Sequence, residues 1–149
     1  MRGHSDCVYL SVGHSFSLGP GSTINLPNTL QKCLVDFYND QFPFANVYSR
    51  AASIDTSIRA SPPNFLRDRA VSHKYLVLNG KRIVASPDIY KAPNSIVQAR
   101  YGTSKFVGQV IEIFTHTQPP VLRPVTLLYV RWFQPLRNRI INTTLWTEW

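Results

Sequence analysis

The segment formed by residues 105–133 constrains the fold more than any other part of the chain. It reads KFVGQVIEIFTHTQPPVLRPVTLLYVRWF and holds two runs of β-branched and aromatic residues separated by a spacer with three prolines. In residues 129–133, large and polar or branched side chains alternate with the two-residue period of a pleated strand. The segment therefore predicts two long strands in a small, strongly twisted β-sheet or barrel.

Further strand signals flank this segment on its N-terminal side. Two strand-like runs, residues 73–78 and 81–85, enclose Asn79 and Gly80, and an Asn-Gly pair in that position predicts a β-hairpin because both residues tolerate a positive φ. Residues 95–101 predict another strand, which a tight turn returns antiparallel into residues 105–114. Several short strands in the last half of the chain are typical of an SH3-like barrel or roll.

The first half of the chain predicts less regular structure. Residues 8–10 suggest an edge strand or a loosely held arm, and residues 28–38 have the apolar spacing of a helix, with Asn28 as its cap and Gln31 completing a capping box. This helix must end before Pro43. Residues 44–72 read as a basic, partly mobile connector. We thus expect an N-terminal arm, helix and connector over residues 1–72 and a barrel-like domain over residues 73–149.

Composition favours a small basic protein with an acidic partner. The chain has 149 residues, enough for one hydrophobic core, and its 11 prolines and 7 glycines disfavour long helices. Sixteen Lys and Arg residues oppose eight Asp and Glu residues, and most of these bases are Arg, which binds phosphates and carboxylates in a bidentate manner. Nucleic acid is the commonest partner of such domains, while acidic protein tails, anionic membrane surfaces and a protein that merely happens to be basic remain alternatives.

Cellular location is suggested by the two cysteines and by the N-terminus. Cys7 and Cys33 form no C-x-x-C pair, which favours a reducing compartment over a disulfide framework or zinc site. The first residues lack an apolar core of signal-peptide length, and no segment has the apolar length of a membrane span. We therefore expect a nuclear or cytoplasmic protein that does not enter a membrane, and leave its oligomeric state open.

No pattern in the sequence points to catalysis, a metal or a cofactor. There is no nucleophile elbow, no family-type cysteine motif and no glycine-rich phosphate loop. The four histidines are widely spaced, and His116 is expected in the proline-rich loop of residues 115–124, where solvent exposure is the simplest expectation. Glu112 is the one acid inside the predicted strand of residues 105–114. We expect a non-enzymatic protein; a nuclease or hydrolase built from acids brought together in space is the alternative.

Aromatic and basic side chains interleave in the C-terminal half, as a groove for a peptide or nucleic acid requires. The predicted ligand-binding aromatics are Tyr101, Tyr129, Trp132 and Trp146. The residues predicted to bind nucleic acid or another acidic partner are Arg100, Lys105, Arg131, Arg137 and Arg139. Many such aromatics instead build the core of a small β-domain. Strand alternation predicts Leu128, Val130 and Trp132 as the interior row, with Arg131 on the opposite face.

Two stretches resemble a known family. Residues 106–114, FVGQVIEIF, and residues 129–135, YVRWFQP, are similar to the central part of bromo-adjacent homology (BAH) domains, in which a strand hGxhxxIF (h, hydrophobic) precedes hVRWFxxP after a loop. Residues 95–101 would form the preceding strand. This resemblance implies a β-rich module without enzymatic activity that binds histone tails, nucleosomes or other chromatin proteins. The proline-rich spacer and the helix have no counterpart in that pattern.

Three functions follow from these observations. The first is a chromatin- or DNA-associated module that binds a histone-type peptide or another acidic partner. The second is a basic domain that binds nucleic acid without sequence preference through its phosphates. The third is a structural remnant of a longer protein, because the chain is also similar to non-catalytic C-terminal regions of fungal transposable-element proteins and its apolar pattern continues to Trp149.

Overall fold

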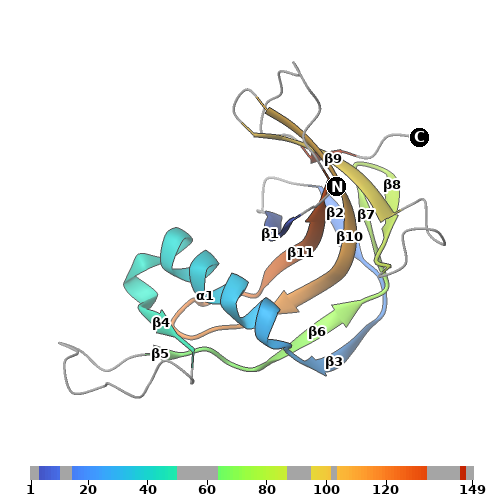
Figure 1. The fold of residues 1–149 in the computed structure, drawn as a ribbon. Helices are drawn as coiled ribbons and strands as arrows, with labels where there is room; N and C mark the ends of the chain where they lie inside the picture. The colour runs from blue at the N-terminus through green and yellow to red at the C-terminus, as the bar shows by residue number, and fades with distance from the viewer. Residues whose placement is uncertain are drawn as a thin grey trace.

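A seven-stranded antiparallel sheet carries most of the regular structure in the computed structural model, which describes residues 4–10, 15–49, 64–86, 95–101, 104–133 and 145–146. The sheet is strongly curved, and a single α-helix crosses one of its faces (Figure 1). The expectation of a mainly β protein is therefore confirmed. The main path of the sheet consists of β1 (His4–Leu10), β11 (Val125–Trp132), β10 (Ser104–His116), β6 (Arg69–His73) and β3 (Gly21–Asn25), in that order.

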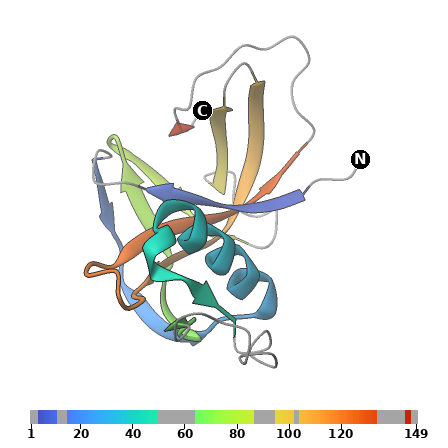
Figure 2. The same cartoon turned by 90° about the vertical axis from the view of Figure 1, so that its left-hand side faces the viewer.

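Strand β10 organises this sheet because it is long enough to pair with three partners. Its first half pairs with β9 (Ile96–Tyr101), which also pairs with β12 (Leu145–Trp146), and its second half lies between β11 and β6. The paired β9 and β10 project away from the rest of the molecule (Figure 2). The predicted antiparallel pairing of these two strands is confirmed; the turn at residues 102–103 lies outside the described residues.

A second sheet contains the predicted hairpin. Strands β7 (Tyr75–Leu78) and β8 (Lys81–Val84) are joined by Asn79 and Gly80, whose φ angles of 52° and 80° are the positive values that this turn requires. The short strand β2 (Phe16–Leu18) pairs with the free side of β7. A parallel pair of two-residue strands, β4 (Val47–Tyr48) and β5 (Asn64–Phe65), forms the third sheet.

The expected closed barrel is not formed by the described strands. The main path ends at β1 on one side and at β3 on the other, and the hairpin belongs to a separate sheet. The expected boundary between residues 72 and 73 falls inside β6, and the main sheet joins strands from both sides of it. Residues that were assigned to an N-terminal arm, in β1 and β3, thus pair with the C-terminal strands through β11 and β6.

The segment expected to be a connector, residues 44–72, contains part of the main sheet, and that expectation is wrong where the structure describes it. Strand β6 pairs with β3 and β10, and a 3-10 helix, η1 (Pro43–Ala45), leads into β4. The sequence RAVSH offers few large apolar residues, so its strand is stabilised by its two neighbours. Residues 50–63, including Arg50 and Arg59, lie outside the described residues.

The helix α1 (Asn28–Gln41) forms where its apolar spacing predicts and ends before Pro43 as expected. Its N-cap is Pro27 and no side chain caps it, so the expected capping role of Asn28 is wrong. Gln31 instead donates from Nε2 to the carbonyl oxygen of Leu26 at 2.8 Å. Leu30, Leu34 and Tyr38, spaced four residues apart, form the buried stripe of α1.

Two hydrophobic clusters lie on the opposite faces of the sheet. The first joins α1 to β10 and β11 through Phe114 and Leu127, and the second packs the β7–β8 hairpin against Leu128, Val130 and Trp132. The predicted interior row is confirmed, and Arg131 is exposed as predicted. Strand β11 is therefore covered on both faces along most of its length, which explains its nearly continuous apolar sequence.

A β-bulge decides which side chains of β10 face the helix. Val110 is opposite Val130, but Glu112 is opposite Tyr129, so Ile111 is an extra residue in the register. An extra residue reverses the alternation of side chains beyond it. Phe114 consequently packs in the α1 cluster, whereas Ile113 packs in the hairpin cluster with Val110. Beyond the bulge, the even-numbered side chains of β10 thus face α1.

Candidate functional site

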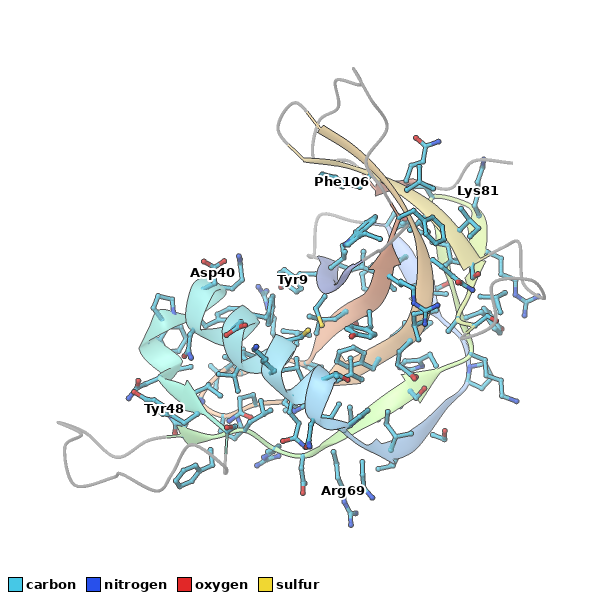
Figure 3. The ribbon with its side chains drawn as sticks, in the orientation of Figure 1. Tyr9, Asp40, Tyr48, Arg69, Lys81 and Phe106 are labelled. Atoms are coloured by element: carbon cyan, nitrogen blue, oxygen red, sulfur yellow. The ribbon has the colours of Figure 1, made fainter. Side chains whose placement is uncertain are left out.

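A groove lies between α1 and the β1–β11 edge of the sheet, and we name it the helix groove. Its volume is about 690 Å³. Strands β1 and β11 contribute Cys7, Tyr9 and Tyr129 to the groove. Helix α1 contributes Thr29, Lys32, Cys33, Asp36, Phe37, Asp40 and Gln41. In Figure 3, Tyr9 and Asp40 lie on the two sides of this region, one on the sheet and one on the helix.

Aromatic rings form the apolar wall of the helix groove. The rings of Tyr9 and Phe37 have centroids 4.9 Å apart and planes inclined at 57°, so two ring faces meet at an angle. Tyr129 is the Cα partner of Cys7, which places its half-buried side chain on the same face of the sheet, one position along from Tyr9. Three aromatic side chains from three elements therefore line one concave surface.

Carboxylates line the α1 side of the groove, beside Phe37, and we name them the acidic wall. Asp36 and Asp40 are four residues apart on α1 and so share one face of the helix, with Lys32 one turn earlier. Both aspartates are exposed, and Gln41 donates from Nε2 to Asp40 Oδ2 at 2.9 Å. The chain as a whole has more basic than acidic residues, with only eight Asp and Glu. The groove differs from this average, because two carboxylates and one ammonium group make it locally acidic.

A buried hydrogen-bond network anchors α1 beneath this groove. His116 is 1% exposed, so its expected exposure is wrong. Its Nε2 lies 2.8 Å from the carbonyl oxygen of Arg67, which can only accept, so Nε2 carries the proton and Nδ1 accepts from the Tyr38 hydroxyl at 2.8 Å. Burial lowers the pKa of His116 from its ordinary value and raises the pKa of Tyr38. The neutral forms of both side chains are therefore favoured.

Gln118 extends this network toward the chain segment before β6. Its Oε1 accepts from the backbone N–H of Arg67 at 2.8 Å, and its Nε2 donates to the carbonyl oxygen of Phe65 at 3.1 Å. The side chain is 1% exposed. One buried side chain thus satisfies backbone groups of Phe65, at the end of β5, and of Arg67, between β5 and β6, which holds Arg67 in place.

A second, smaller groove lies on the opposite side of this network, where β3, β6 and β10 meet, and we name it the arginine groove. Its volume is about 370 Å³. Its lining consists of Thr23, Arg67, Asp68, Arg69, Ala70, Val71, Thr115 and Thr117. Two exposed guanidinium groups, one carboxylate and three hydroxyl groups therefore surround it. Arg69 projects outward from the sheet in Figure 3.

Of the predicted site residues, only Tyr129, Trp132 and Arg131 have described side chains, and their environments differ. Tyr129 lines the helix groove, whereas Trp132 is 6% exposed and packs beside Phe106, with ring centroids 6.0 Å apart. Arg131 is exposed on β11. Tyr101, Arg100, Lys105 and Trp146 lie on described strands, but their side chains are outside the described part, as are Arg137 and Arg139 entirely.

The sequence predictions missed most of the helix groove. Tyr9, Phe37, Asp36 and Asp40 all lie in the half that was expected to be an arm, a helix and a connector. Part of the signal for the acidic wall was present, because Lys32 and Asp36 are four residues apart on the predicted helix 28–38, and Asp40 follows at the same interval just beyond its predicted end. No sequence signal linked that face to the rings of β1 and β11, since the contact joins segments far apart in the chain.

Among the described residues, no helix is long and apolar enough to span a membrane. In that same part of the chain, no three His, Cys, Asp or Glu side chains are grouped as metal ligands would be. The chain matches no protein-family model, no curated protein and no solved structure. The resemblance to BAH domains therefore stays a prediction.

Proposed function

We propose that this protein is a non-enzymatic interaction module whose helix groove binds a cationic side chain of a peptide, with a methylated lysine as the best fit. The observation that carries the proposal is the pairing of three aromatic side chains with two carboxylates around one concave surface. The resemblance to BAH domains supports a histone tail or another chromatin protein as the source of the peptide, and hence a nuclear location.

The chemistry of the groove matches a quaternary ammonium group. Such a group cannot donate hydrogen bonds and is weakly hydrated, so it gains from ring faces, each contact being worth about 0.5–2 kcal/mol depending on desolvation. Tyr9, Phe37 and Tyr129 all line the groove, and the rings of Tyr9 and Phe37 pack against each other at an angle of 57°. Asp36 and Asp40 add coulombic attraction for any cation that enters.

The charge distribution favours a cationic ligand here and an anionic one elsewhere. The formal net charge of +8 would repel a lysine-rich peptide from most of the surface, so binding requires a locally acidic site. Of the acids whose side chains are described, Asp36 and Asp40 line the helix groove, Asp68 lines the arginine groove, and Glu112 bonds to the hydroxyl of Ser72. The helix groove is thus the most acidic of the described surfaces.

The test compares one lysine-rich peptide in unmodified and trimethylated forms by titration calorimetry or fluorescence anisotropy. The wild-type protein should bind the trimethylated form more tightly. The double variant Asp36→Asn/Asp40→Asn should weaken that binding about tenfold, the equivalent of about 1.4 kcal/mol, because it removes the coulombic attraction without changing shape. Asp68→Asn is the matched control, since it removes an exposed carboxylate outside the groove.

A second variant separates the rings from the charges. Tyr129→Leu keeps an apolar side chain in the groove but removes the aromatic face, so it should reduce the preference for the trimethylated peptide over the unmodified one. Failure of the wild-type protein to bind either peptide would refute the proposal. It would also fail if the Asp36→Asn/Asp40→Asn variant bound as tightly as the Asp68→Asn control.

Nucleic-acid binding is the second candidate function, and the arginine groove is the observation that favours it. Arg67 and Arg69 flank this groove together with hydroxyl groups, a combination suited to phosphate oxygens. Duplex DNA should then bind with a steep salt dependence, and Arg67→Ala/Arg69→Ala should reduce the log–log slope by about 1.8, or about 0.9 per lost phosphate contact. The control variant Lys74→Ala/Lys81→Ala removes the same amount of charge from exposed positions outside this groove. An equal reduction of the salt slope in the two double variants would exclude the arginine groove as the binding site.

A further inference from the structure

We propose that Cys7 of β1 and Cys33 of α1 form a reversible disulfide bond across the helix groove. Both side chains line this groove and both are half-buried, one on the sheet and one on the helix. Each is a thiol in this structure. They are the only two cysteines of the chain, so the proposed bond has a single possible pairing within one molecule.

The relative direction of β1 and α1 places Cys7 and Cys33 at the same position along the two elements. Strand β1 and helix α1 lie side by side and run in the same N-to-C direction (Figure 2). Tyr9, two residues after Cys7, contacts Phe37, four residues after Cys33, with a centroid separation of 4.9 Å. Two strand residues advance by about 6.7 Å and four helix residues by about 6 Å. One step back from the Tyr9–Phe37 contact on each element therefore leads to Cys7 and Cys33.

Side-chain direction agrees with this placement. Alternate residues of a strand share a face, so Cys7 points to the same side of the sheet as Tyr9, and Cys7 packs against the α1 cluster. Residues four apart share a helix face, so Cys33 lies on the same face of α1 as Phe37. The small volume of cysteine on both elements also permits the close backbone approach that a disulfide requires, with Cα atoms about 4.4–6.8 Å apart.

The bond forms by two thiol–disulfide exchanges with a low-molecular-weight disulfide such as oxidised glutathione. The thiolate of one cysteine attacks a glutathione sulfur, giving a mixed disulfide and releasing one reduced glutathione. The thiolate of the other cysteine then attacks the protein sulfur of that mixed disulfide and releases the second glutathione. The protein loses two protons and two electrons, and the glutathione disulfide gains them as two thiols.

The disulfide would control the helix groove. It would place a covalent link across the groove beside Tyr129, in the space that the peptide side chain would occupy, so oxidation should weaken peptide binding by several fold. This consequence rests on the proposed function, whereas formation of the bond does not. Thiol counting and peptide titration on the same sample therefore distinguish a failure of the disulfide from a failure of the binding proposal.

The experiment equilibrates the full chain in buffers of increasing ratio of oxidised to reduced glutathione, quenches with acid, alkylates free thiols under denaturing conditions and measures the intact mass. The wild-type protein should pass from two alkylated thiols to none as a monomer, without bound glutathione. Cys7→Ser and Cys33→Ser should each retain one thiol or gain one glutathione. The proposal is overturned if the oxidised wild-type protein carries two glutathione adducts, forms disulfide-linked dimers, or keeps both thiols at ratios that modify the single variants.

Discussion

At the scale of single residues, the contact between Tyr38 and His116 joins α1 to β10. Both side chains are fully buried, and the hydroxyl of Tyr38 donates to Nδ1 of His116 at 2.8 Å. A buried acceptor left without its donor costs about 1–3 kcal/mol. This pair therefore contributes to the attachment of α1, on which the whole acidic wall of the helix groove depends.

Tyr38→Phe should lower the free energy of unfolding by about 1–3 kcal/mol, because the ring still fills its place while Nδ1 of His116 loses its donor. Urea denaturation followed by circular dichroism measures this change. Tyr75→Phe, at a half-buried position on β7 where Arg82 lies over the ring, is a control for the loss of a tyrosine hydroxyl. Equal stability of Tyr38→Phe and the wild-type protein would show that the hydrogen bond has no net value.

His116 should make the fold sensitive to acid. Burial lowers its pKa in the folded state, so between its ordinary value of 6.5 and the lowered value the unfolded chain binds a proton that the folded chain does not. Stability is thus complete above pH 6.5 and falls as the pH decreases through that window, by up to about 1.4 kcal/mol per pH unit.

The measurement for His116 compares the free energies of unfolding of wild-type protein and His116→Gln at pH 7 and pH 5. Glutamine has a donor and an acceptor but does not titrate in this range. The loss of stability between pH 7 and pH 5 should therefore be smaller in the variant than in the wild-type protein. Equal losses would show that other groups cause the acid sensitivity.

At the scale of elements, two glycines, Gly108 inside β10 and Gly80 in the hairpin turn, are required for different physical reasons. A Cβ at Gly108 on β10 would lie 2.6 Å from side-chain atoms of both Trp132 and Val130 and 2.9 Å from a backbone oxygen of β11. A Cβ at Gly80 would meet nothing within 4 Å, but this residue has a φ of +80°. The first glycine permits close packing between strand and core, and the second permits the hairpin turn.

Gly108→Ala should destabilise the protein by about 1–3 kcal/mol because the added methyl group overpacks the core beside Trp132. Gly80→Ala should cost about 1–2 kcal/mol through its backbone conformation alone. Tryptophan fluorescence during urea unfolding distinguishes them, since only Gly108→Ala should also change the native emission spectrum. An unchanged spectrum for Gly108→Ala would mean that Trp132 does not pack against this glycine.

Sequence patterns predicted elements well where one strand or turn carries its own signal. The Asn79-Gly80 hairpin, the β9–β10 pair and the interior row of β11 were all predictable, because the positive φ and the alternation are local properties. Strand β6 was not, since the sequence RAVSH is weakly apolar and is held in place by β3 and β10. The apolar stripe predicted α1, but not the lack of a side-chain cap at its start.

At the scale of the whole molecule, the two halves of the chain share one sheet. The N-terminal β1 covers one side of β11, and α1 buries Phe114 and Leu127 of the C-terminal strands. Each hydrophobic cluster contains residues from both sides of position 72. The free energy that holds the C-terminal strands together thus comes in part from the N-terminal half.

A fragment of residues 73–149 should accordingly fail to fold by itself. It would lack β1, β3, α1 and most of β6, and would expose one entire face of β10 and β11. Circular dichroism and thermal unfolding of the fragment, beside the full chain, provide the measurement. A cooperative transition in the fragment would show instead that residues 73–149 form a domain on their own.

The sequence by itself determined the β-rich class, the basic charge, the hairpin turn, the helix stripe and the buried row of Leu128, Val130 and Trp132 on β11, because these depend on composition, on backbone preferences or on short periods. Tertiary structure alone decided the helix groove and the burial of His116. The bulge at Ile111 reversed the side-chain alternation of β10, and α1 then packed on the face that this reversal created. Such contacts join residues about eighty positions apart, as Tyr38 and His116 are, and no local pattern encodes them.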